Sequence, residues 1–180
     1  MTPMKQVQKN VGKQQAVIIM NGRAGVGKDS LMDIARDYFT VRNLSSVLRI
    51  KEAALAAGWD GEYDNRGRQL LADIKMALVK YEPMIITNWL YAEYLKFKSV
   101  EQDVMFIHIR EAEEIEKFKK LVPHAKAILV TRKDGNKMAV DTSENTLNDY
   151  PWDFVFANDE PLKKSGKKFV KLIEKIRGGK

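Results

Sequence analysis

A short segment near the start of the chain has the residue types and spacing of a phosphate-binding loop. The run Gly22-Arg-Ala-Gly-Val-Gly-Lys-Asp-Ser30 matches the pattern G-x-x-x-x-G-K. Glycines let the backbone turn so that successive N–H groups point into one concavity, and the lysine adds a mobile positive charge for outer phosphates. We therefore predict that this segment binds the phosphates of a ligand, through Gly22, Arg23, Ala24, Gly25, Val26, Gly27, Lys28, Asp29 and Ser30.

The residues on either side of this loop are those that such a loop needs. Residues 16–20 are a short β-branched apolar run that predicts a buried strand. Residues 31–39 place their apolar side chains on one face of a helix. The first turn of that helix would direct unpaired N–H groups and the positive end of its dipole at the same phosphates.

One position departs from the usual pattern, because Asp29 stands where a serine or threonine normally follows the lysine. A carboxylate there could hold Mg²⁺ directly or through water, could pair with Lys28, or could act as a base toward an acceptor oxygen. It could also be a first-turn aspartate that interacts only with the helix dipole. We expect the metal or acceptor role for Asp29, whereas the two isolated histidines, His108 and His124, predict no metal site.

Four positively charged side chains and one acid are placed to support phosphoryl transfer. Arg110 and Glu111 follow the predicted strand 104–109, and Arg132 follows the predicted strand 127–130. Carboxyl ends of parallel strands meet at one sheet edge, so both arginines could face the loop. Arg68 and Lys75 lie seven residues apart and share one helix face.

We therefore predict Lys28, Asp29 and Arg110 as catalytic residues, and Arg132 as a nucleotide contact. Arg68, Lys75 and Glu111 are predicted to bind the acceptor. The alternative for each arginine is a surface ion pair, and Glu111 could equally be the N-cap or a first-turn acid of the next helix.

The remaining patterns predict one α/β domain over residues 1–180. A weaker strand is expected at 45–50 and a short last strand at 154–156, and helices are expected at 51–57, from Asp64 onward, at 83–97, at 111–121 and at 161–180. Strands that alternate with helices predict a parallel sheet covered on both faces. Residues 1–14 are expected to form a flexible arm, and residues 133–150 either a lid or a surface loop.

Composition excludes several classes of protein. The 180 residues contain no cysteine, which removes disulfides and thiolate metal sites. The start of the chain lacks the apolar core of a signal peptide, and no apolar stretch reaches the roughly 18 residues of a membrane helix. We therefore expect a cytoplasmic protein without a membrane partner.

The net charge of +7 lies in the last part of the chain. Residues 161–180 hold eight basic residues and one acid, so the basic and acidic residues in the rest of the chain are equal in number. Phe169, Val170, Ile173 and Ile176 recur there at helical spacing, which favours an amphipathic helix with a solvated lysine face over an anion-binding tail. Nucleic acid is not an expected partner, because its binders usually spread positive charge over a groove.

The sequence resembles a known branch of phosphate-binding-loop (P-loop) proteins. The Gly-Lys-Asp-Ser form of the loop is similar to that of phage-type deoxynucleoside monophosphate kinases and, more distantly, phosphomevalonate kinases. Further similarities are Arg68–Lys75, His108–Glu111, Leu129–Arg132 and Asn158–Asp159. The resemblance implies a three-layer P-loop fold with a five-stranded parallel sheet in order 2-3-1-4-5. It also implies ATP and Mg²⁺ as cofactors, and transfer of the γ-phosphate to a small phosphorylated acceptor such as a (deoxy)nucleoside monophosphate.

Two other functions remain open at this point. A nucleotide-binding switch or ATPase without an acceptor would usually carry a strand that ends in an aspartate holding Mg²⁺. Here the strand at 104–109 is followed by Arg110 and Glu111, which argues against that class. A kinase of a non-nucleotide phosphorylated metabolite is equally compatible with the loop. The sequence does not identify the acceptor or the oligomeric state.

Overall fold

The computed structural model describes residues 14–133 and 150–178. Most of the predicted arm at 1–14, and all but the ends of the predicted lid at 133–150, lie outside these residues. The elements in chain order are β1 (Ala16–Asn21), α1 (Lys28–Arg36), β2 (Val41–Ser45), α2 (Leu48–Ala56), α3 (Asn65–Tyr81), α4 (Ile85–Lys98), β3 (Val104–His108), α5 (Ala112–Leu121), β4 (Lys126–Thr131), β5 (Phe154–Ala157) and α6 (Leu162–Ile176).

The five strands form one parallel sheet in the order β2-β3-β1-β4-β5, as the resemblance implied. In the register, Met20 of β1 lies opposite His108 of β3, which in turn lies opposite Ser45 of β2. The carboxyl ends of the three strands are therefore level, and β1 leads there directly into the glycine-rich loop. The topology places the phosphate-binding segment at the centre of one sheet edge.

The predicted strand at 45–50 is wrong. The strand is β2, which ends at Ser45, and the helix α2 has already begun at Leu48. The apolar residues of this stretch fit a helix, because Ile50 and Ala54 are four residues apart and both are buried. The Ser46 N–H donates to His108 O at 2.9 Å, which is the last link of this chain segment to the sheet.

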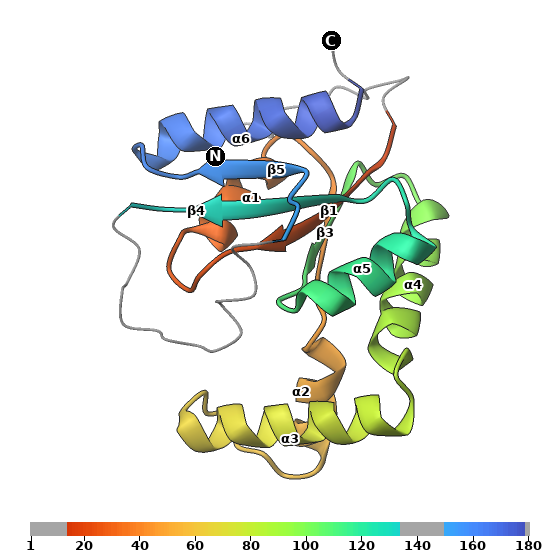
Figure 1. Cartoon of the computed structure of the whole chain (residues 1–180). Coiled ribbons are helices and arrows are strands. Elements are labelled where there is room, and N and C mark those ends of the chain that lie inside the picture. The colour runs from red at the N-terminus through yellow and green to blue at the C-terminus, as the bar shows by residue number, and fades with distance from the viewer. Residues whose placement is uncertain (1–13, 134–149, 179–180) are drawn as a thin grey trace, which may run out of the picture.

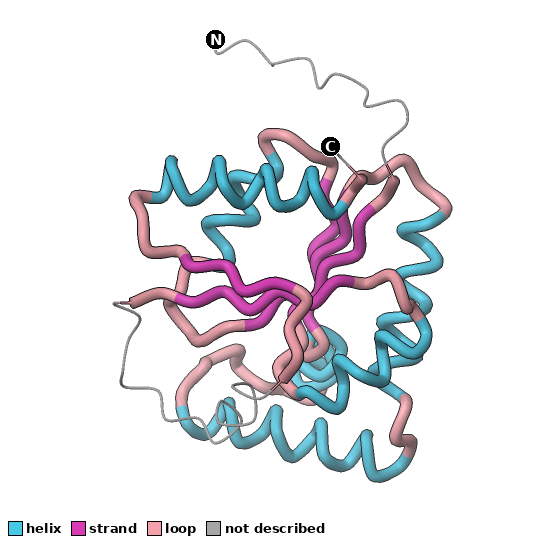
Figure 2. The backbone as a smooth tube through the Cα atoms, turned by 45° about the horizontal axis from the view of Figure 1, so that its top comes forward, coloured by secondary structure: helices cyan, strands magenta, loops and turns pink. Residues whose placement is uncertain are grey.

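Alternate residues of the central strands build two separate cores. Val17 and Ile19 point into a core with α2, α3, α4 and α5, whereas Ile18 and Met20 point into a core with α1 and α6. This division follows from the two-residue repeat of a strand, because successive side chains point to opposite faces. Helices consequently cover both faces of the sheet (Figure 2), and every residue of the central strand β1 is buried.

Helix α3 forms a further layer beyond α2, away from the sheet (Figure 1). Asp64 begins this helix as predicted, because its side chain accepts a hydrogen bond of 2.7 Å from the Gly67 N–H. Leu71 is the buried apolar contact of α3, while Leu70, Met76 and Tyr81 stay exposed. The layer is thus tied to the body through one face of a long helix.

The basic segment at the end of the chain forms the amphipathic helix α6, as predicted. Phe169, Val170 and Ile173 are buried on the sheet, and Gly166 allows close approach to α1, because a Cβ atom there would lie 2.4 Å from Ile34 Cδ1. The lysines of α6 lie on its outer side and are exposed. Among residues 14–133 and 150–178, no helix combines the length and apolar character needed to cross a bilayer.

Candidate active site

The loop between β1 and α1 requires glycine at both of its ends. Gly22 has φ 137°, and a Cβ atom there would lie 2.3 Å from Val130 O of the neighbouring strand. Gly27 has φ 87°, and a Cβ atom there would lie 2.5 Å from Asn158 Nδ2. Both backbone conformations are ones that side-chain-bearing residues rarely adopt. The glycines predicted from the motif are therefore required by the geometry of the loop and by what packs against it.

Lys28 folds back over this loop. Its Nζ donates to Gly22 O at 2.5 Å and to Arg23 O at 2.9 Å. The ammonium group thus lies above the concavity that the loop encloses, where a phosphate oxygen could replace these carbonyl contacts. Arg23, Ala24 and Gly25 form the exposed tip of the loop.

Two asparagines fix the loop in place, and sequence reasoning assigned a role to neither. Asn21 is buried, and its Nδ2 donates to Ile109 O at 2.7 Å and to Arg110 O at 3.0 Å, while its Oδ1 accepts from the Gly22 N–H at 2.6 Å. Asn158 is also buried and donates from Nδ2 to Val26 O at 2.8 Å. The available signal for Asn21 was a polar residue at the end of a buried strand. Asn158 follows β5, which is partly exposed and gives no such signal.

Asp29 and Ser30 occupy the first turn of α1 and are exposed beside the loop. Within the described part of the chain, no group of three or more histidine or acidic side chains could hold a metal ion by itself. A single carboxylate beside the loop suits Mg²⁺, because Mg²⁺ in proteins usually takes one or two carboxylates and completes its coordination shell with water and substrate phosphates. Asp29 is the carboxylate that the loop itself offers.

His108 is half-buried at the carboxyl end of β3. Burial lowers the pKa of the His108 imidazole, the Asp29 charge acts to raise that pKa, and the Lys28 and Arg110 charges lower it further. The three charged side chains of the predicted catalytic set therefore act on one half-buried ring. The Arg110 side chain is itself exposed.

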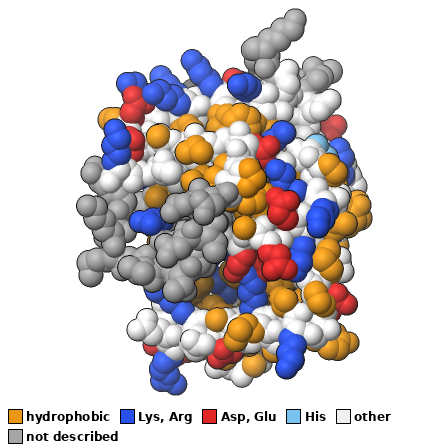
Figure 3. All heavy atoms as spheres, viewed as in Figure 1, with side chains coloured by type: hydrophobic (Ala, Val, Ile, Leu, Met, Phe, Trp, Pro, Cys, Tyr) orange, Lys and Arg blue, Asp and Glu red, His pale blue; other side chains and the backbone are white. Residues whose placement is uncertain are grey.

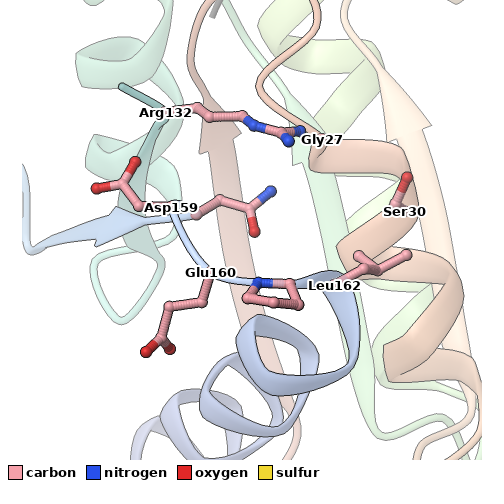
Figure 4. A pocket seen from close by; sticks show the side chains of 8 residues that line it. Gly27, Ser30, Arg132, Asp159, Glu160 and Leu162 are labelled. Atoms are coloured by element: carbon pink, nitrogen blue, oxygen red, sulfur yellow. The ribbon is translucent and has the colours of Figure 1, made fainter. Parts of the chain in front are cut away.

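A pocket of about 340 Å³ opens next to the loop (Figure 4). It lies between the start of α1 and the segment that joins β5 to α6, and Arg132 extends across it toward Gly27 (Figure 4). Asp159 accepts a hydrogen bond of 2.8 Å from the Lys133 N–H, which fixes the pocket wall. The pocket is lined by Gly27, Ser30, Arg132, Asn158, Asp159, Glu160, Pro161 and Leu162.

Lys75 and Glu111, both predicted to bind the acceptor, contact each other. Lys75 Nζ lies 2.7 Å from Glu111 Oε1 and 2.9 Å from Glu114 Oε1, and only 17% of the Lys75 side chain is exposed. Burial acts to raise the pKa of Glu111, but Lys75 outweighs it and the pKa lies below its usual value. Burial raises the pKa of Glu114 in spite of Lys75, and the Glu111 charge adds to the rise. The Lys75 charge is thus already matched by carboxylates.

Arg68, the third predicted acceptor residue, is exposed on α3 and lies over the ring of Tyr63, with its Cζ 5.8 Å from the ring centroid. The Lys51 Nζ lies 4.6 Å from the same centroid. Sequence reasoning missed Lys51 and Tyr63, because the contact joins three consecutive elements whose packing the local pattern does not indicate. Arg68 and Lys75 both lie on α3, but Arg68 contacts the Tyr63 ring, whereas Lys75 pairs with Glu111 and Glu114.

Comparison with known proteins supports the fold. No family model matches the sequence, and no curated protein matches it either. Among solved structures, a dephospho-CoA kinase from Campylobacter jejuni has a TM-score of 0.53 and 15% identity over 92% of this chain and 99% of that chain. A protein from Thermus thermophilus has a TM-score of 0.54 and 15% identity, over 91% of this chain and 98% of that one.

A sugar kinase from a Janibacter species has a TM-score of 0.52 and 9% identity, over 89% of this chain and 95% of that one. These identities are low, so the similarity shows the fold, which is that of P-loop kinases. The finer resemblance to phage-type deoxynucleoside monophosphate kinases stays a prediction.

Proposed function

We propose that this protein is an ATP-dependent kinase that transfers the γ-phosphate to a small phosphorylated acceptor, and that this acceptor is a (deoxy)nucleoside monophosphate. The observation that carries the proposal is the loop Gly22–Ser30 at the centre of the sheet's carboxyl edge, with Lys28 folded over it. Main-chain amides and one ammonium group in that arrangement suit the outer phosphates of a nucleoside triphosphate. The kinase folds of the comparison structures support the same reaction class.

The pocket beside the loop is proposed to hold the adenosine part of ATP. Its volume of about 340 Å³ is in the range of small-ligand sites, and it adjoins Gly27 at the end of the loop. Arg132 is the exposed cation that lines it and can lie against a base or pair with a phosphate. ATP would thus lie across the start of α1.

Mg²⁺, when bound, would neutralise charge on the phosphates during transfer. Asp29 is proposed to hold it, with the Ser30 hydroxyl beside it, and Arg110 to neutralise charge on the transferred group. His108 would border the same space from the end of β3. On the acceptor side, we propose Arg68 as a phosphate contact, and the Lys75–Glu111 pair as a unit that shapes the acceptor pocket.

Phosphotransfer is favoured over an acceptor-free switch by two features of the site. The strand β3 ends in His108 and is followed by Arg110 rather than by an aspartate that could anchor Mg²⁺. A separate layer with exposed positive charge, α2 and α3, follows β2 at the carboxyl edge of the sheet. A switch protein binds no phosphorylated acceptor and therefore needs no such layer.

The test is ADP formation from ATP and Mg²⁺ across a panel of nucleoside monophosphates, deoxynucleoside monophosphates and phosphorylated non-nucleotide alcohols. We expect one class of acceptor to raise the rate well above the ATP-only background, and the Lys28→Ala variant to abolish the rise. If only a non-nucleotide acceptor raises the rate, the nucleotide form of the proposal is wrong. If no acceptor does so while the protein remains folded, the kinase proposal fails.

A further inference from the structure

Residues 109–111 join β3 to α5 and are called the Arg110 turn below. Asn21, the last residue of β1, is buried and holds this turn from the side of the phosphate-binding loop. Its Nδ2 donates to Ile109 O at 2.7 Å and to Arg110 O at 3.0 Å, and its Oδ1 accepts from the Gly22 N–H at 2.6 Å. One side chain therefore fixes the backbone of the Arg110 turn against the first residue of the loop.

Helix α3 holds the same turn through a group of three charged side chains. Glu111 is the N-cap residue of α5, and Glu114 lies in the first turn of that helix, where the helix dipole favours acids. Lys75 Nζ of α3 lies 2.7 Å from Glu111 Oε1 and 2.9 Å from Glu114 Oε1. Because 17% of the Lys75 side chain and 12% of the Glu114 side chain are exposed, solvent ions screen this contact little.

Arg110 therefore lies between two neighbours whose positions are fixed. Ile109 is buried in the core and Glu111 is paired with α3, whereas the Arg110 side chain is exposed. On the face drawn in the space-filling view, acidic side chains gather where α5 lies, with Lys and Arg side chains beside them (Figure 3). Because the turn contacts the loop through Asn21 and the α2–α3 layer through Lys75, its position depends on both.

We infer that Lys75 and Glu114 are positioning residues for phosphoryl transfer, which hold Glu111 and thereby the Arg110 turn; this inference rests on the proposed kinase function. A group that neutralises charge on the transferred phosphoryl group must be placed closely, because a displacement of about 1 Å can lower the rate about a hundredfold. This role goes beyond shaping the acceptor pocket, since it predicts an effect of Lys75 on the rate of transfer.

A direct contact between Lys75 and the acceptor is the competing explanation. It would require the ammonium group to leave two carboxylates that lie within 2.9 Å of it. Separating a largely buried ion pair is unfavourable, because each charge is then left without its partner. The two explanations differ in what they predict, since a positioning residue changes kcat and an acceptor contact changes KM for the acceptor.

The experiment is a double-mutant cycle between Lys75 and Arg110, with the acceptor that most raises ADP formation by the wild type. Lys75→Met keeps the bulk of the side chain and removes its charge. It should lower kcat about tenfold and leave KM for ATP and for the acceptor within about twofold of the wild type. In an Arg110→Ala background the same change should lower kcat no further, because Lys75 acts through Arg110. Lys75→Arg, which can pair with both carboxylates, should recover most of the rate.

Glu113→Gln is the matched control. Glu113 lies in the same first turn of α5, but 80% of its side chain is exposed and it pairs with Lys117 at 2.7 Å. This variant should match the wild type. Thermal midpoints establish folding. If Lys75→Met does not fold because Glu114 is left unpaired, the variant that combines Lys75→Met with Glu114→Gln takes its place in the cycle.

Three kinetic results would overturn the inference: unchanged kcat in the folded Lys75→Met variant, an equal loss in the Arg110→Ala background, or a change in KM for the acceptor alone. A readout without activity is the ¹H–¹⁵N amide signals of Arg110 and Gly22, which Lys75→Met should shift and Glu113→Gln should not. Unmoved signals would also contradict the inference. If the wild type phosphorylates no acceptor, the kinase proposal fails, and these signals still decide whether Lys75 holds the turn.

Discussion

Asn158 Nδ2 donates a buried hydrogen bond of 2.8 Å to Val26 O, and this bond joins the segment after the last strand to the phosphate-binding loop. The Asn158 N–H donates in turn to Thr131 O at 2.8 Å, so the loop is held by the β4–β5 side of the sheet. A loop that binds phosphates with main-chain groups depends on its shape, because these groups cannot adjust independently. The contact therefore links ATP affinity to a residue outside the motif.

We predict that Asn158→Ala weakens both folding and ATP binding. The change leaves the buried Val26 carbonyl without a partner, which costs about 1–3 kcal/mol. Urea unfolding measures the stability, and equilibrium dialysis measures ATP affinity. The control is Asn88→Ala, at an exposed position of α4. A variant with wild-type stability and ATP affinity would show that the contact does not shape the loop.

Replacing Lys28 tests the ammonium group that lies over the loop. Lys28→Ala should lower kcat/KM for the acceptor reaction by about a hundredfold or more, because it removes the ammonium group that would stabilise the negative charge of the transferred phosphoryl group. The unfolding midpoint should change little, since Nζ donates to the loop carbonyls of Gly22 and Arg23 and is not part of the apolar core. Lys171→Ala on the outer face of α6 serves as a matched control. Near-normal turnover in Lys28→Ala would contradict the assignment.

Arg132 should act on ATP and not on the acceptor. Arg132→Ala is expected to raise KM for ATP about tenfold, as is typical for the loss of one charged contact, and to leave KM for the acceptor unchanged. Steady-state kinetics with each substrate varied in turn separates the two values. Arg36→Ala, an exposed arginine on α1 that pairs with Asp33, is the control. A change in KM for the acceptor alone would contradict the assignment of Arg132 to the ATP site.

Asp103 predicts the acid sensitivity of the fold. Burial acts to raise the pKa of this carboxyl, but hydrogen bonds from Thr40 and the charge of Arg177 outweigh burial and hold the pKa below 3.8. The stabilisation is therefore fully present well above the ordinary aspartate pKa and is lost as the pH falls through the lower pKa of the folded state.

Asp103→Asn should lower the free energy of unfolding by about 2–4 kcal/mol near pH 7, because it leaves the buried Arg177 guanidinium without its carboxylate partner. The difference from the wild type should shrink below pH 3.8. Urea titrations at several pH values test both statements, with Asp37→Asn, an exposed position, as the control. A difference that stays constant down to the acid limit would exclude this role for Asp103.

The fold was largely predictable because its signals are local. The apolar runs of β1, β3 and β4, and the motif between β1 and α1, indicate their structures within a few residues of sequence. The stretch 45–50 misled because Val47, Leu48 and Ile50 are β-branched or apolar, and only the packing of Val47 and Ile50 into the core, with Leu48 exposed, distinguishes a helix face from a strand. Tertiary packing decides such short runs.

The site was less predictable because it depends on contacts between distant elements. The pairing of Lys75 with Glu111 and Glu114 joins α3 to α5, and sequence spacing within one helix could not indicate it. The stacking of Lys51 and Arg68 on Tyr63 likewise requires the turn between α2 and α3. Spacing identified which residues could bind phosphate, and three-dimensional contacts show which of them are already matched by other charges.

The most direct test of the central claim is equilibrium dialysis of the wild-type protein against radiolabelled ATP with Mg²⁺. If main-chain amides of the loop and Lys28 hold the phosphates, about one ATP should bind per chain, and inorganic tripolyphosphate, which lacks the base, should displace it. Folded protein that retains no ATP at any concentration up to the millimolar range, or ATP that tripolyphosphate cannot displace, would contradict the account.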